Sequence, residues 1–70
     1  MDFPTWHDPA GKAISCTEKI KVLNENIEEL QQMAQDAFED ALLLGCDETQ
    51  IRQTLQIILQ HLHNPYLNKN

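Results

Sequence analysis

Apolar residues between Ser15 and Leu44 alternate in spacing between three and four, which places one side chain per turn on a single helical face. No proline or glycine interrupts this stretch, and strong helix formers dominate it. A capping box, Ser15-x-x-Glu18, marks its beginning. The pattern therefore predicts a long amphipathic helix at about 16–44. The positions of its apolar seam are Ile20, Leu23, Ile27, Leu30, Ala34, Ala37, Ala41 and Leu44.

Signals for a helix end and a helix start then follow each other closely. Gly45 suits the left-handed position after a helix, and Asp47, with Gln50 three residues later, suits an N-cap. A second helix is predicted at about 48–63, because Asn64 precedes Pro65 and is biased away from helix. Its apolar stripe comprises Ile51, Leu55, Ile58 and Leu62. Together these signals predict an all-α, two-helix antiparallel hairpin.

The segments on either side of the hairpin do not show a helical pattern. Residues 1–14 are predicted to form an extended N-terminal segment, because Pro4 and Pro9 disfavour helix in the residues before them. Ala10-Gly11, after Pro9, is predicted to be a turn. The hairpin occupies 15–64, and 65–70 is predicted to be a flexible tail. Phe3 and Trp6 lie in the N-terminal segment, either as a hook for a partner or folded back on the chain's own apolar face.

The two predicted helices differ in length by roughly 20 Å at 1.5 Å per residue. The shorter helix therefore leaves Ile20, Leu23 and the outer side of Ile27 uncovered, although each would gain roughly 1.5–3 kcal/mol on full burial. A second copy could cover them in a homodimeric four-helix bundle, or residues 1–14 could lie across them. We expect the homodimer, with the N-terminal segment also packing.

Charge narrows the possible partners. The chain has 5 Lys and Arg against 11 Asp and Glu, and its net charge is −6. The few cations are scattered along the chain, which disfavours nucleic acid and anionic membrane surfaces. Residues 1–15 lack the apolar region of a signal peptide, and no apolar run approaches the roughly 20 residues that span a bilayer. The expected location is cytoplasmic, with no membrane partner.

The residues able to carry chemistry are few. Histidines and cysteines lack the paired short spacings of zinc sites, so neither a metal nor another cofactor is expected. Cys16 lies in the first helical turn, where the thiolate is favoured, but no base can be assigned to it, and an enzyme is not expected. The alternative that remains open is a metal-linked or redox-responsive sensor that uses Cys16 and His7.

Over residues 15–63, the apolar seam, tight turn and length resemble those of the Rop-type hairpin dimers. This resemblance implies an antiparallel four-helix bundle of two copies. Rop-type RNA binding uses basic and polar residues on a bundle face that is acidic here, so an RNA-binding regulator is the least favoured alternative.

We therefore expect a small acidic, non-enzymatic protein that acts through protein–protein interaction. Its role would be that of an adaptor, a regulator or an accessory protein of the kind found in bacterial operons. The expected partners are a second copy and another protein. The expected interface residues are Phe3, Trp6, Ile20, Leu23, Ile27, Leu30 and Met33.

Overall fold

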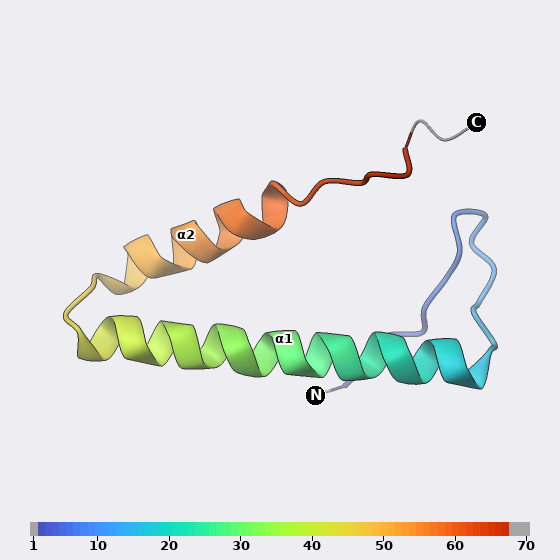
Figure 1. Ribbon diagram of the computed structural model, residues 1–70, viewed down its shortest axis with the longest axis horizontal. Helices are drawn as coiled ribbons and strands as arrows, with labels where there is room; N and C mark the ends of the chain where they lie inside the picture. The colour runs from blue at the N-terminus through green and yellow to red at the C-terminus, as the bar shows by residue number, and fades with distance from the viewer. Residues whose placement is uncertain (1, 68–70) are drawn as a thin grey trace. The chain divides into compact units, whose positions relative to one another are not determined.

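The computed structural model describes residues 2–67, and in that range it contains two helices, α1 (Thr17–Leu43) and α2 (Glu48–Gln60) (Figure 1). They form an all-α, antiparallel two-helix hairpin, which confirms the predicted fold class. The last three residues of the predicted tail, 68–70, lie outside the described residues.

The chain divides into two compact units, and α1 contributes to both. The N-terminal unit, Met1–Gln35, combines the N-terminal segment with the first part of α1. The C-terminal unit, Asp36–Asn70, combines the end of α1 with the interhelical turn and α2. Each unit therefore has its own set of contacts on one part of the long helix.

The N-terminal segment folds back on itself around a tight turn (Figure 1). Asp8, Pro9 and Gly11 occupy positions that a type I turn favours, and Gly11 takes a left-handed φ of +86°. The Asp8 side chain accepts hydrogen bonds from the amides of Ala10 (3.0 Å) and Lys12 (2.9 Å). An isolated antiparallel bridge joins the residues on either side of the turn, so the predicted extended segment is an ordered reversal.

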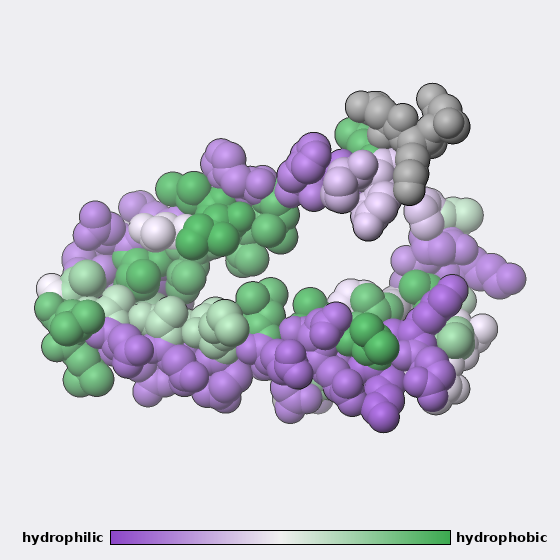
Figure 2. All heavy atoms as spheres, in the orientation of Figure 1, coloured by the Kyte–Doolittle hydropathy of each residue, from purple (hydrophilic) through white to green (hydrophobic). Residues whose placement is uncertain are grey.

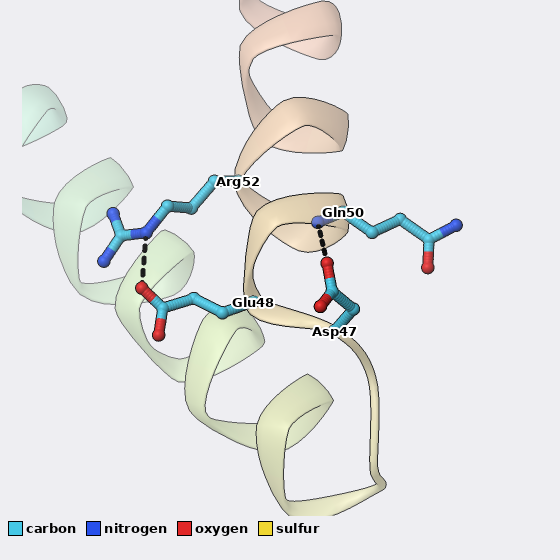
Figure 3. A network of polar contacts seen from close by, with 4 residues as sticks. All are labelled: Asp47, Glu48, Gln50 and Arg52. Atoms are coloured by element: carbon cyan, nitrogen blue, oxygen red, sulfur yellow. Dashed lines mark hydrogen bonds and ion pairs between the residues drawn. The ribbon is translucent and has the colours of Figure 1, made fainter.

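The turn between the helices follows the sequence signals closely. Gly45 has a φ of +93°; its amide donates to Leu42 O at 3.1 Å, and the Cys46 amide donates to Ala41 O at 2.9 Å. These two bonds are those of a Schellman motif. Asp47 Oδ2 then accepts from the Gln50 amide at 3.0 Å and caps α2 (Figure 3). The predicted stop at Gly45 and start at Asp47 are thus confirmed.

Both helices are shorter than the sequence suggested. α1 loses one residue at each end, whereas α2 ends three residues before the predicted position 63. The His61 amide is shared between Ile57 O (3.1 Å) and Ile58 O (3.3 Å), and its ring Nδ1 lies 2.8 Å from Ile57 O. The last turn is therefore tightened, and the chain leaves the helix before Pro65 restricts it.

No residue in the range 2–67 is fully buried, so the apolar faces are covered only in part. The half-buried residues of the N-terminal unit are Phe3, Trp6, Ile14, Ile20, Leu23, Asn24, Ile27 and Ala34. Those of the C-terminal unit are Phe38, Ala41, Ile51 and Leu55. The seam predicted from the sequence is the most covered part of α1, although Leu30, Ala37 and Leu44 remain exposed.

Candidate interaction surface

One hydrogen bond fixes the N-terminal segment to α1. Trp6 Nε1 donates to Asn24 Oδ1 at 2.8 Å, and both residues are half-buried. Asn24 shares its helical face with Ile20 and Ile27, because these positions are separated by three or four residues. Trp6 is therefore folded back on the chain's own apolar face, which is one of the two roles considered for it.

Part of the N-terminal unit remains open to solvent. Leu30 is 47% exposed and Met33 is 70% exposed. Val22 is also exposed, and it lines a shallow apolar depression. The other residues that line this depression are Ile14, Glu18, Lys19 and Leu23. Of the seven predicted interface residues, Leu30 and Met33 are thus exposed, and the remaining five are half-buried.

The apolar stripe of α2 changes from covered to exposed along its length. Ile51 and Leu55 are half-buried in the C-terminal unit, whereas Ile58 is 56% and Leu62 is 73% exposed. Figure 2 shows the hydrophobic side chains gathered along α2 and hydrophilic ones along the lower edge of α1. Ile58, near the end of α2, and Leu62, just beyond it, are therefore largely uncovered apolar side chains.

Arg52 joins α2 to α1 within the C-terminal unit. Its Cζ lies 4.7 Å from the centroid of the Phe38 ring, and its Nε lies 3.0 Å from Glu48 Oε2 (Figure 3). The ion pair is well exposed and adds little, whereas the cation–π contact links two elements. Residues 53–60, which follow, carry no charged side chain.

In contrast to the uncharged residues 53–60, α1 is acidic along most of its length. Between Val22 and Leu43 it carries six carboxylates and no Lys or Arg. These are Glu25, Glu28, Glu29, Asp36, Glu39 and Asp40. Their spacing places them beside the apolar seam and on the opposite side of the helix, so the surface of α1 away from the seam is acidic.

Across residues 2–67, no three His, Cys, Asp or Glu side chains lie close enough together to hold a metal ion.

Cys16 precedes the first residue of α1 and occupies its N-cap position, one residue after the expected Ser15. The amide of Lys19 donates to its sulfur and lowers the pKa of the thiol below its ordinary value, while desolvation opposes this. The Glu18 amide and the charge of Lys19 lower the pKa further. Cys16 is therefore an exposed thiol with enhanced thiolate character.

Sequence reasoning missed Asn24. The predicted turn at Ala10-Gly11 is present, but the part that the Asp8 side chain plays in it was missed. Asn24 is the one polar member of the half-buried stripe at 20, 23, 24 and 27, and a polar residue within an apolar stripe is a signal for a specific partner. The order Asp8-Pro9-Ala10-Gly11 is itself a turn signature.

The fold and surface define a small all-α hairpin with exposed apolar side chains on both helices. No protein-family model, curated protein or solved structure matches the chain. Neither helix within residues 2–67 combines the length and hydropathy of a membrane-spanning segment.

Proposed function

We propose that this chain is a non-enzymatic binding protein that acts as an adaptor, accessory or regulatory protein. The observation that carries this proposal is the exposure of large apolar side chains on both helices of a chain in which no described residue is buried. Clustered apolar side chains at a surface mark contacts with other proteins. The proposal includes self-association into a homodimer as well as binding of a different protein.

The surface favoured for the different protein is the exposed side of the N-terminal unit, at Leu30 and Met33. Both side chains are exposed, and both residues follow Asn24, the partner of Trp6, along α1. The proposed surface also includes half-buried apolar residues of the same unit, Phe3, Ile20, Leu23 and Ile27. A long, unbranched Met side chain adapts to different partner shapes, which suits it to a binding surface.

The surroundings of the Cys16 thiol favour a binding role over catalysis. The atoms that act on the Cys16 sulfur are the amides of Lys19 and Glu18 and the Lys19 charge. These groups lower the pKa of the thiol, but none of them accepts its proton. A nucleophilic enzyme needs a base within hydrogen-bonding distance of the nucleophile.

The test is a double variant, Leu30→Asp with Met33→Asp, used in affinity capture of the native partner from the source cells. Both side chains are exposed, so helicity measured by circular dichroism should persist while capture falls by about tenfold or more, as expected for loss of apolar anchors. Lys21→Asp is a matched control, because it changes the net charge equally from the opposite side of the helix.

Retained capture by the folded double variant would overturn the choice of Leu30 and Met33. Equal loss in Lys21→Asp would attribute the effect to charge rather than to the apolar surface. Loss of helicity in the double variant would instead assign Leu30 and Met33 a structural role.

Cys16 favours a second candidate function, a redox response. Its thiol is exposed, and its pKa is lowered by the first turn of α1. Oxidation of such a thiolate would change the charge and size of the group at the helix start. The metal-linked form of this alternative, with His7, lacks a matching group of three ligands within residues 2–67. An oxidant-dependent change in partner binding that Cys16→Ser abolishes would support the redox form.

A further inference from the structure

A row of exposed positions on α1 lies beside the half-buried seam, on the flank opposite Asn24. Its members, Val22, Asn26, Leu30 and Met33, are four, four and three residues apart, so each helical turn contributes one. Val22 is 54%, Leu30 is 47% and Met33 is 70% exposed. This exposed row therefore presents apolar side chains along about 16 Å of the helix.

The exposed row begins at the shallow depression beside the start of α1. Three of the five residues that line this depression are apolar, and they include Val22. An apolar side chain of a partner can enter the depression while others pack on Leu30 and Met33, two to three turns further along the helix. Side chains that fill such hollows contribute strongly to binding.

Carboxylates border the exposed row on the side away from the seam. Glu18 and Glu25 are the neighbours of Val22, four residues before it and three after it. Glu29 is the neighbour of Met33, four residues before it. Among residues 2–67, no salt bridge engages any of these three carboxylates. A partner would therefore meet apolar side chains bordered by negative charge.

We propose that the exposed row binds an amphipathic helix of another protein, whose apolar face is bordered by Lys and Arg. A helix suits a row with one side chain per turn, because ridges of side chains on one helix pack into the grooves of another. The partner's cations then lie against the bordering carboxylates. The inference rests on the proposed binding function and specifies the chemistry of the partner at that surface.

The cations of this chain argue against a second copy as the bound helix. Within α1 and α2 they are Lys19, Lys21 and Arg52. Arg52 already pairs with Glu48 at 3.0 Å and contacts the Phe38 ring. Lys19 and Lys21 point about 160° apart around the helix, so they do not border a common face. The net charge of −6 also opposes a copy and favours a cationic partner.

Three fluorescein-labelled peptides, each about 18 residues or five helical turns long, provide the probe. The first has an apolar face of Leu and Ala bordered by Lys, the second has Glu in place of each Lys, and the third scrambles the order of the first. Binding to the full-length chain would be measured by fluorescence anisotropy. We expect the Lys-bordered peptide to bind about tenfold or more tightly than either control, and to bind roughly tenfold more weakly when NaCl is raised from about 50 to about 300 mM.

Two adjacent glutamates make a matched pair of variants. Glu29→Lys reverses a bordering charge, whereas Glu28→Lys makes the same change about 100° further around the helix, away from Met33. We expect Glu29→Lys to weaken binding of the Lys-bordered peptide about fivefold or more, and Glu28→Lys to weaken it less than about twofold. Leu30→Ala with Met33→Ala keeps the charge and should weaken it about tenfold or more. Glu25→Lys replaces Glu29→Lys if circular dichroism shows that the latter loses helicity.

Failure of this inference and failure of the proposed function are distinguishable. Equal binding of the Lys-bordered and Glu-bordered peptides, lost in the alanine double variant, overturns the basic partner and leaves the binding role of Leu30 and Met33 in place. Tight binding of the scrambled peptide, or equal weakening by Glu28→Lys and Glu29→Lys, shows attraction by net charge alone and overturns the inference. A Lys-bordered peptide that does not bind overturns it too, whereas the surface in the proposed function fails only if capture of the native partner survives Leu30→Asp with Met33→Asp.

Discussion

The two units cover their parts of α1 by different means. In the N-terminal unit an irregular segment lies against the helix, and one side-chain hydrogen bond, from Trp6 to Asn24, ties them together. In the C-terminal unit a second helix does so, after a Schellman motif at Gly45 and an N-cap at Asp47. One unit thus depends on a contact between distant residues, and the other on backbone geometry set locally.

This difference predicts how each unit responds to mutation. A contact between residues 18 positions apart contributes only while both partners are held in place. A turn defined by consecutive residues persists even when the side chains around it change. Loss of the long-range side-chain contact should therefore affect the N-terminal unit, whereas a backbone variant in either turn should affect the unit that contains that turn.

Trp6→Ala should have the largest effect on stability. Replacing a fully buried tryptophan with alanine lowers the free energy of unfolding by roughly 3–5 kcal/mol. Because Trp6 is only half-buried, we expect a loss of about 2 kcal/mol. Urea unfolding followed by circular dichroism measures the loss, and amide exchange should show it concentrated near Leu23 rather than Leu55. Leu43→Ala, which alters an 86% exposed side chain, is the control and should change little. An unchanged Trp6→Ala protein would mean that the segment does not stabilise the helix.

Gly45→Ala should be the next largest. Its φ of +93° is strained for any residue with a Cβ, at a cost of roughly 1–2 kcal/mol. No atom lies within 4 Å of the added methyl position, so the cost comes from the backbone alone. Amide protection in α2 should fall, whereas the fluorescence of Trp6 should not change.

Gly11→Ala provides the converse experiment in the other unit. Its φ of +86° and open surroundings match those of Gly45, so the local backbone cost is the same. It should change Trp6 fluorescence and leave α2 protection intact. If either variant affected both units equally, the two units would not respond separately. Gly45→Asn should be milder than Gly45→Ala, because Asn tolerates this conformation.

The same contrast explains how far the sequence could be interpreted. Gly45 and Asp47 were predictable because their conformations follow from a few neighbouring residues. The Trp6–Asn24 hydrogen bond was not predictable, because the residues around Trp6 do not determine which distant polar side chain its indole will contact. At the start of α1, Ser15 and Cys16 both offer a side chain that can accept from the first amides, and the helix begins one residue later than Ser15 would place it. The exposure of Ile58 likewise escapes periodicity, which identifies a face but not what covers it.

Asn24→Ala should have a smaller effect than either backbone variant. It removes the acceptor of the Trp6 indole, which contributes about 1 kcal/mol, but alanine also favours the helix by several tenths of that. We therefore expect a net loss of about 0.5 kcal/mol, with a red shift in the emission of the chain's single tryptophan. Asn24→Asp keeps an acceptor and should retain the native emission. If Asn24→Ala emitted as the wild type does, Trp6 would be held by apolar contacts alone.

The smallest effect on stability should come from Cys16, whose pKa is lowered in the folded chain by the Lys19 amide. Because the folded pKa lies below the unfolded one, the thiolate's contribution is present above the unfolded pKa and is lost as pH falls through the folded pKa. Cys16 is fully exposed, so alkylation is a more sensitive readout than unfolding. In a Cys46→Ser background, the pH midpoint of iodoacetamide reaction should be lower in the folded chain than in urea. Lys19→Met keeps the amide and removes only the charge, so it should preserve most of the difference. A folded midpoint equal to that in urea would show that the first turn of α1 does not activate the thiol, and the redox candidate would lose its support.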